Sequence, residues 1–294
     1  MKPGPFDYHR AESVEQVLEL LQQHGYDAKL LAGGQSLVPA MNFRLSMPAV
    51  LIDLNRVPGL DGIRVDDGVL RIGAMARQHA AELSADVARA APLIAEALPH
   101  VAHPQIRNRG TMGGSIAHAD PAAELPAVML ALGASFRVHG PGGTRTVAAD
   151  DFFTGLFATA LEPDEMLGEI QVPAAAPGAG SAFLEISRRH GDFALAGLAA
   201  SVRLDDDGRC AAARIALLGV GEGPALALAA AAALEGSDGS ADAIRAAVDA
   251  ARAEVDPPYD IHASSDYRRH LVGVLVSRAL PVAFERARAN RGAS

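Results

Sequence analysis

The segment LLAGGQSLVPAMNFRL, residues 30–45, joins two apolar stretches through two adjacent glycines and a short polar run. The apolar residues predict a strand over 28–32, and Ser36 is expected to cap a helix that follows. Paired glycines tolerate positive φ and can expose consecutive backbone N–H groups, an arrangement that binds phosphates. No lysine accompanies this turn, whereas loops that support phosphoryl transfer carry one. The segment therefore predicts an anion that is held rather than cleaved.

A second turn of the same build, TMGGS, occupies residues 111–115. Like the first, it precedes a predicted helix, where free N–H groups and the helix dipole favour an anion. Two such turns can hold both phosphates of a pyrophosphate, with Ser36, Thr111 and Ser115 as hydroxyl donors. Either glycine pair alone is more commonly an ordinary tight turn. The spacing G-x-G-x-x-G is absent, so the pair favours a dinucleotide without a Rossmann fold.

Composition limits the classes of function. The 294 residues are 49% hydrophobic and 21% charged, which is typical of a globular protein, and the net charge of −9 argues against nucleic acid as a partner. Cys210 is the single cysteine, which excludes internal disulfides and cysteine-ligated iron–sulfur clusters, and it is expected to be a buried apolar residue. Lys2 and Lys29 are the only lysines, so a P-loop or Schiff-base mechanism is not expected. Without an apolar leader or a membrane span, the chain is expected to be cytoplasmic.

Local patterns predict an α+β protein in three units, over residues 1–58, 59–175 and 176–294. The linker composition of AAAPGAG, residues 174–180, marks the second boundary. The third unit is expected to hold a three-stranded antiparallel sheet followed by helices. The other expected elements are helices at 14–24 and in two pieces over 77–98, strands at 49–55 and 166–173, hairpins around Asp67-Gly68 and over 134–149, and C-terminal helices near 224–235, 240–254 and 265–290.

The segment HADPAAELP, residues 118–126, permits several interpretations. Asp120 is well placed to cap a helix with Pro121 at its first position. His118, Asp120 and Glu124 could instead ligate a metal, although three ligands across a helix start make an unusual geometry.

Two further alternatives concern the residues around the second turn. Ser115 has part of the nucleophile-elbow pattern G-x-S-x-G, which leaves a serine hydrolase as an alternative. Arg107 and Arg109 can neutralise a phosphate or contact a partner, but solvated surface positions are the more common outcome for arginine.

Together, AGGQSLVPAMNFRL and NRGTMGGSIAHADPAAELP resemble the two FAD-binding signatures of the medium subunit of molybdenum hydroxylases, the family of xanthine dehydrogenase and carbon monoxide dehydrogenase. The resemblance extends to LEPDEMLGEIQVP and EISRRHGDFAL and covers nearly the whole chain. It implies a two-subdomain FAD-binding PCMH-type fold, as in vanillyl-alcohol oxidase, followed by a C-terminal α+β domain.

The resemblance also implies a set of FAD contacts and no catalytic side chain. One glycine segment would hold the pyrophosphate and ribityl chain, the other would close the opposite side, and the residues after it would lie near the ribose or adenosine. Leu167 would pack near the flavin ring. The implied contacts are Leu30, Leu31, Ala32, Gly33, Gly34, Gln35, Ser36, Leu37, Val101, Ala102, Thr111, Gly113, Gly114, Ser115, Ala117, His118, Asp120, Glu124, Leu167 and Glu185.

One position departs from the family pattern. Several relatives have a lysine in the strand where this chain has Leu184 and Glu185. A positive charge stabilises an anionic reduced flavin, so its loss predicts a lower flavin potential or a different electron acceptor. Arg188 is the residue that can compensate.

The implied partners are a small subunit with two [2Fe-2S] clusters and a large subunit with the molybdenum cofactor, assembled as a dimer of heterotrimers. The expected function is electron transfer through FAD to an external acceptor. A free-standing flavin-dependent oxidoreductase and a flavin-free binding module are the alternatives within this fold.

Overall fold

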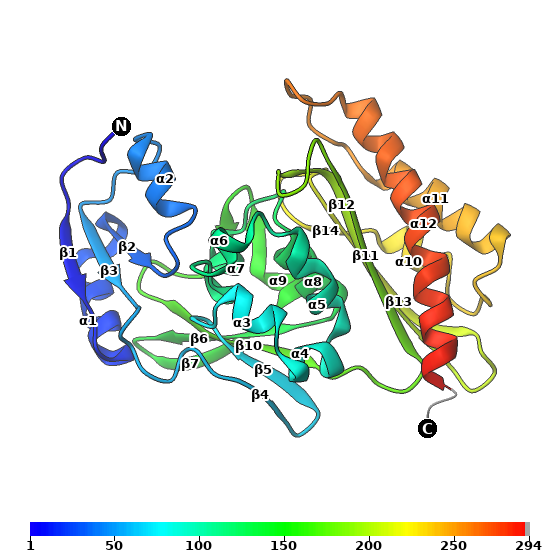
Figure 1. Ribbon diagram of the computed structural model, residues 1–294, viewed down its shortest axis with the longest axis horizontal. Coiled ribbons are helices and arrows are strands. Elements are labelled where there is room, and N and C mark those ends of the chain that lie inside the picture. Colours follow the sequence, from blue (N-terminus) through cyan, green and yellow to red (C-terminus); the bar gives the residue numbers. More distant parts are fainter. Residues whose placement is uncertain (292–294) are drawn as a thin grey trace.

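The computed structural model describes residues 1–291, which follow one another in chain order along an elongated molecule (Figure 1). Helices and sheets are both present, which confirms the predicted α+β class. The unit boundaries near residues 58 and 175 stay predictions, and residues 292–294 of the third unit lie outside the described part. No helix among residues 1–291 combines the length and apolar character needed to cross a membrane.

The N-terminal part is a three-stranded parallel sheet in the order β1 (Asp7–Arg10), β3 (Val50–Asp53), β2 (Ala28–Leu31). The strand β1 was not predicted, because DYHR carries no apolar signal and three of its four residues are exposed. Both outer strands run parallel to β3, so the carboxyl ends of β2 and β3 meet at one edge. The first glycine turn begins at that edge.

Two helices flank this sheet. In α1 (Val14–His24), Ser13 Oγ accepts the N–H of Gln16 at 3.2 Å, and Gly25 ends the helix with φ +51°. The short helix α2 (Leu37–Asn42) follows the glycine turn as predicted. The predicted cap is wrong, because the side chain of Ser36 forms no capping hydrogen bond.

The middle part is a five-stranded sheet with short helices against it (Figure 1). Its last strand in sequence, β10 (Met166–Pro173), lies at the centre and pairs antiparallel on both sides. The region 77–98 holds three helices rather than two, with the predicted break at Pro92. The other strands, in sheet order around β10, are β4 (Ile63–Asp66), β5 (Val69–Gly73), β6 (Ser135–Gly140) and β7 (Gly143–Ala148). The helices are α3 (Gln78–Glu82), α4 (Ala85–Ala90), α5 (Pro92–Ala97), α6 (Pro104–Arg107), α7 (Met112–His118), α8 (Glu124–Ala131) and α9 (Ala149–Phe152), and a hairpin of β8 (Phe153–Gly155) and β9 (Ala158–Thr159) follows.

The C-terminal part is an antiparallel sheet with four strands rather than the predicted three. The additional strand β14 (Ala225–Leu226) pairs with β13, so the helix expected from residue 224 begins only at Leu228. The strands β11 (Ala179–Ser187), β12 (Ala194–Leu204) and β13 (Cys210–Leu218) form the meander, and α10 (Leu228–Ala232), α11 (Ala241–Glu254) and α12 (Ser265–Arg291) complete the chain.

The C-terminal sheet is buried on both faces. The long helix α12 covers one face, and α8 and α5 of the middle part pack against the other. Phe183 of β11 and Leu218 of β13 therefore belong to the same apolar cluster as the middle part. Cys210 is 2% exposed, which confirms that it is a buried apolar residue, and burial raises the pKa of its thiol.

Candidate functional site

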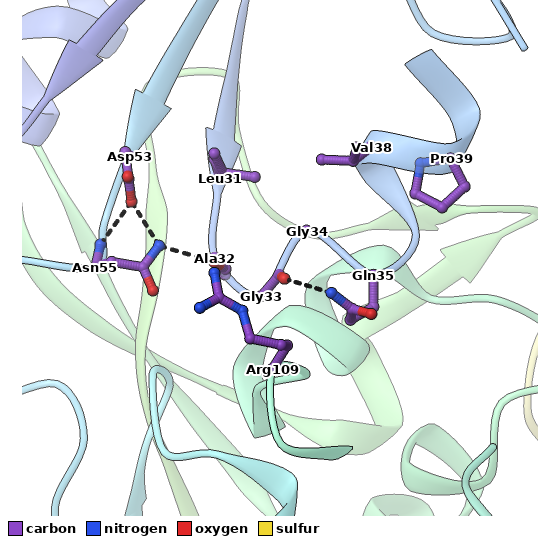
Figure 2. A pocket seen from close by; sticks show the side chains of 10 residues that line it. All are labelled: Leu31, Ala32, Gly33, Gly34, Gln35, Val38, Pro39, Asp53, Asn55 and Arg109. Atoms are coloured by element: carbon purple, nitrogen blue, oxygen red, sulfur yellow. Dashed lines mark hydrogen bonds between the residues drawn. The ribbon is translucent and has the colours of Figure 1, made fainter. Parts of the chain in front are cut away.

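A cavity of about 340 Å³ lies where the parallel strands β2 and β3 end (Figure 2). Ligands of open sheets bind at the carboxyl ends of parallel strands, so this position is typical of a binding site. Figure 2 shows α2 on one side of the cavity and the side chain of Arg109 on the other. The lining residues are Leu31, Ala32, Gly33, Gly34, Gln35, Val38, Pro39, Asp53, Asn55 and Arg109.

The first glycine turn presents five consecutive free amides. Within residues 1–291, the backbone N–H groups from Gly33 to Leu37 donate to no other protein atom. Gly34 has φ +73°, and the side chain of Gln35 fixes the turn by donating to the carbonyl oxygen of Gly33 at 3.0 Å. Successive N–H groups around a left-handed residue form a concave anion site. The turn thus has the geometry expected from the sequence.

The second glycine turn behaves differently, and the expectation of free amides there is wrong. All four N–H groups from Met112 to Ser115 already have acceptors in the protein. Gly113 and Gly114 instead allow close packing, because a Cβ on Gly113 would lie 2.5 Å from that of Ala74. In chain order the four acceptors are Ala76 O at 2.9 Å, Ala74 O at 2.9 Å, Thr111 Oγ1 at 3.1 Å and Thr111 O at 3.2 Å.

Thr111 is the cap of α7, which the capping bond to Gly114 shows. Ser115 follows inside the same helix, and its hydroxyl forms no hydrogen bond within the described chain. It therefore lacks both the strand-to-helix elbow and the base partner that a nucleophilic serine needs. The geometry gives no support to a serine hydrolase.

The two glycine segments touch through their backbones. A Cβ added to Gly33 would lie 2.4 Å from the carbonyl oxygen of Arg109 and 2.8 Å from Cα of Gly110. Real Cβ atoms do not approach that closely, so Gly33 is required for this contact. The contact holds the free amides of the first turn against the segment that leads into α7.

Two arginines add positive charge beside the free amides. Neither Arg77 nor Arg109 forms an ion pair within residues 1–291, although Arg77 donates to the carbonyl oxygen of Arg109 and, at 2.6 Å, to Oδ1 of Asn55. Burial, and then the charge of Arg109, lower the pKa of Arg77. The charges of Asp53 and Asp61 act on Arg77 in the opposite sense and offset part of this positive charge. Two neighbouring guanidinium groups favour an anion beside them.

Asn55 and Asp53 were not predicted as site residues, although both lie at the end of the predicted strand. Nδ2 of Asn55 donates to the carbonyl oxygen of Ala32 at 3.0 Å and to Oδ1 of Asp53 at 2.6 Å. Burial alone would raise the pKa of Asp53, but hydrogen bonds from Tyr8 and Asn55 outweigh it and lower the pKa. The ionised Asp53 therefore fixes Asn55 against the glycine turn. The rule that neighbouring parallel strands end at one edge was the signal that could have identified them.

Arg107 is buried, so the expectation of a solvated position is wrong for this arginine. Its Nε and Nη2 donate to the two carboxylate oxygens of Glu82 at 2.8 and 3.1 Å. Its Nη1 donates to the carbonyl oxygen of Val101 at 3.0 Å. Arg107 therefore fixes the segment of Val101 and Ala102, where Ala102 has φ +46°.

Replacing Arg107 with methionine is expected to lower the free energy of unfolding by about 3 kcal/mol, because it leaves Glu82 and the carbonyl of Val101 without their donor in a buried site. Urea unfolding at neutral pH measures this change. Arg89→Met is the matched control, since Arg89 pairs with Asp86 at the surface and should cost less than about 1 kcal/mol. Equal effects of the two variants would contradict the structural role given to Arg107.

Residues 119–123 form a turn between α7 and α8, and the predicted N-cap at Asp120 is wrong. Oδ1 of Asp120 accepts the N–H of Ala122 at 2.9 Å, while α8 begins only at Glu124. Asp120 lines a second cavity of about 640 Å³ between the middle and C-terminal parts. The ring of His118 packs in a tilted orientation against that of Phe157, with the ring centroids 5.1 Å apart. Burial lowers the pKa of His118. In residues 1–291 these side chains do not form a group that could hold a metal ion.

The charge of Glu185 acts on the buried carboxyl of Glu124, although the resemblance implied the adenosine end of the cofactor for Glu124 and the flavin end for Glu185. Glu124 is 7% exposed, and burial followed by the charge of Glu185 raises its pKa to about 8. The Glu185 side chain is 4% exposed and lies 3.5 Å from Nδ1 of His100. Leu167 is buried in β10.

Comparisons with known proteins agree with this architecture. Residues 4–175 match the family model "FAD binding domain in molybdopterin dehydrogenase", and residues 181–283 match "CO dehydrogenase flavoprotein C-terminal domain". The chain is 46% identical over 288 residues to the 6-hydroxypseudooxynicotine dehydrogenase complex subunit alpha of Paenarthrobacter nicotinovorans, covering 98% of this chain and 97% of that one. It is 43% identical to the carbon monoxide dehydrogenase medium chain of Hydrogenophaga pseudoflava, covering 97% and 99%.

Solved structures show the same similarity. A chain of carbon monoxide dehydrogenase from Hydrogenophaga pseudoflava superposes with a TM-score of 0.95 at 45% identity, covering 97% of this chain and 99% of that chain. A chain of quinoline 2-oxidoreductase from Pseudomonas putida 86 superposes with a TM-score of 0.91 at 38% identity, covering 99% and 100%.

This chain belongs to the family of FAD-binding medium subunits of molybdenum-hydroxylase-type dehydrogenases. The predicted family, fold class and cofactor are confirmed: the protein is an oxidoreductase component, and its cofactor is FAD.

Proposed function

We propose that this chain is the electron-transfer flavoprotein subunit of a molybdenum-containing dehydrogenase complex. Electrons would arrive from [2Fe-2S] clusters on a partner subunit and leave through FAD to an external acceptor. The observation that carries the proposal is the run of free amides in a chain of this family, because it supplies the anion site that FAD requires. With one buried cysteine, the chain has no ligand set for iron–sulfur clusters of its own.

The pyrophosphate of FAD would lie against the amides of Gly33 to Leu37, with Arg77 and Arg109 neutralising its charge. This placement follows from the free N–H groups, the unpaired guanidinium groups and the cavity beside them. The FAD contacts implied by the resemblance stay proposals. One group is the first glycine segment, residues 30–37. The second group lies in and after the second glycine turn and comprises Thr111, Gly113, Gly114, Ser115, Ala117, His118, Asp120 and Glu124. The remaining contacts are Val101, Ala102, Leu167 and Glu185.

The protein would bind and orient the cofactor, and bound FAD would supply the redox chemistry itself. The predicted compensation by Arg188 has little support, because Asp192 pairs with it at 2.8 Å and offsets its charge. Glu185 is itself paired with His100. The absence of a free positive charge around Glu185 therefore agrees with a lower flavin potential than in relatives that have a lysine in this strand.

The proposed partners are a small subunit with two [2Fe-2S] clusters and a large subunit with the molybdenum cofactor, in a cytoplasmic dimer of heterotrimers. Relatives named as a medium chain and as a subunit of a dehydrogenase complex support an assembly of this kind. A free-standing flavin-dependent oxidoreductase is the remaining alternative.

Purifying the native complex tests this function. We expect two co-purifying chains, together with a visible spectrum that combines flavin and iron–sulfur absorption. A yellow protein that purifies alone and turns over a substrate would support the free-standing alternative. A colourless protein that fails to bind added FAD would overturn both.

A further inference from the structure

One side-chain hydrogen bond links the N-terminal part of the chain to the rest of the molecule. Nη2 of Arg77 donates to Oδ1 of Asn55 at 2.6 Å. Within residues 1–291, no other hydrogen bond or ion pair connects residues 1–58 with residues 59–291. The other contacts between the two parts are van der Waals packing, in which Met75 and Met166 of the middle part join the N-terminal apolar cluster. Asn55 and Arg77 therefore form the polar link between the two parts.

This link belongs to a closed ring of contacts around the first glycine turn. Nδ2 of Asn55 donates to the carbonyl oxygen of Ala32 at 3.0 Å, directly before Gly33 (Figure 2). Nη1 of Arg77 donates to the carbonyl oxygen of Arg109. That same oxygen is the atom that a Cβ on Gly33 would meet first, at 2.4 Å. The ring thus runs from the glycine turn through Asn55 and Arg77 to Arg109, and from there back to the turn.

Each member of the link is also held within its own part. Oδ1 of Asp53 accepts the backbone N–H of Asn55 at 2.8 Å and its Nδ2 at 2.6 Å. The backbone of Arg77 pairs with that of Thr111 in an isolated antiparallel bridge. Asn55 therefore moves with the N-terminal sheet, and Arg77 moves with the second glycine segment. The hydrogen bond between them fixes the position of one glycine segment relative to the other.

The link is better suited to setting geometry than to stabilising the fold. Asn55 is exposed and Arg77 is only partly buried. A hydrogen bond at such a position adds little to the free energy of unfolding, because water replaces it at small cost. A guanidinium group is planar and rigid, so acceptors on both Nη atoms fix its orientation.

We propose that Asn55 is a positioning residue for the cofactor. Through Arg77, it keeps the carbonyl oxygen of Arg109 against Gly33. This contact sets the distance between the free amides of the first glycine turn and the guanidinium group of Arg109. The inference rests on the proposed function, which places the pyrophosphate of FAD beside these groups.

The first test follows the guanidinium group of Arg77 in the flavin-free full chain. The chain is labelled with ¹⁵N-arginine, the Arg77 signals are assigned with Arg77→Met, and NMR measures rotation about the Cζ–Nε bond. Because Asn55 holds one of the two Nη atoms, this rotation should be at least about tenfold faster in Asn55→Ala than in the wild type. Asn108→Ala is the matched control, since the exposed side chain of Asn108 forms no hydrogen bond within residues 1–291. Equal rotation rates in Asn55→Ala and the wild type would overturn the inference.

The second test measures FAD affinity by fluorescence titration in a double-mutant cycle. Asn55→Ala should bind FAD about tenfold more weakly than the wild type, while its urea unfolding midpoint without flavin stays unchanged. Both residues act through one ring of contacts. The variant with Asn55→Ala and Arg77→Met together should therefore bind FAD no more than about threefold more weakly than Arg77→Met alone. Asn108→Ala should keep the wild-type affinity.

The outcomes of the cycle separate this inference from the proposed function. Two substitutions whose effects multiply, or wild-type affinity in Asn55→Ala beside weakened binding in Arg77→Met, would overturn the positioning role and leave the proposed FAD site standing. A lowered unfolding midpoint in Asn55→Ala would also overturn it, because Asn55 would then serve the fold. Wild-type affinity in both single variants would contradict the placement of the pyrophosphate beside these groups, and the inference with it.

Discussion

Replacing Gly33 with alanine is expected to weaken FAD binding at least about 100-fold, so that the variant purifies without yellow colour. The added Cβ would lie 2.4 Å from the carbonyl oxygen of Arg109, and backbone atoms cannot yield as a flexible side chain does. The turn must move away from Arg109, which disrupts the free amides from Gly33 to Leu37. Losing several charge-assisted hydrogen bonds to a pyrophosphate accounts for a change of this size. Fluorescence titration with FAD measures the affinity.

Gly142→Ala is the matched control for this substitution. Gly142 lies in the exposed turn between β6 and β7, where an added Cβ would meet no atom within 4 Å. It should bind FAD as the wild type does. A Gly33→Ala variant with wild-type affinity would show that the first glycine turn does not hold the cofactor.

Replacing Glu124 with glutamine is expected to stabilise the chain at alkaline pH and to remove a pH dependence of its stability. Because folding raises the pKa of Glu124 from 4.5 to about 8, the native state binds more protons than the unfolded state between these values. The contribution of Glu124 to stability is therefore greatest below about pH 4.5, falls as the pH rises, and levels off above about pH 8. Glutamine resembles the protonated acid and avoids this loss, which amounts to about 4 kcal/mol at pH 8.

Urea unfolding of the flavin-free chain at about pH 5 and about pH 8 measures this difference. We expect Glu124→Gln and the wild type to diverge only at the higher pH. Glu19→Gln, whose carboxylate is exposed, should follow the wild type at both values. Parallel behaviour of Glu124→Gln and the wild type would mean that Glu124 is ionised in the native state at neutral pH.

Much of the fold was predictable because its elements carry local signals. Ser13 and Gly25 cap the two ends of α1. Alternating and apolar runs of residues predicted β3, β10 and most of the C-terminal sheet. The strand β1 was missed because its stability comes from pairing with β3 rather than from its own residues. The helix at Asp120 was misplaced because an aspartate that caps a turn and one that caps a helix have the same sequence signature.

The candidate site was predictable only in part for a related reason. The glycine pairs indicate where N–H groups can be exposed, but not whether another part of the chain accepts them. The carbonyl oxygens of Ala76 and Ala74 accept hydrogen bonds from the N–H groups of Met112 and Gly113. No local sequence pattern indicates these contacts. The burial of Arg107 and that of Glu124 likewise depend on tertiary packing.

An amide NMR titration of the full chain with FAD tests the central claim most directly. The account predicts saturation at one FAD per chain, with the largest shifts at the amides of Gly33 to Leu37, whose N–H groups are free. The amides from Met112 to Ser115 should shift less, because they keep their acceptors within the protein. Absence of saturation, or largest shifts at Met112 to Ser115 with Gly33 to Leu37 unchanged, would contradict it.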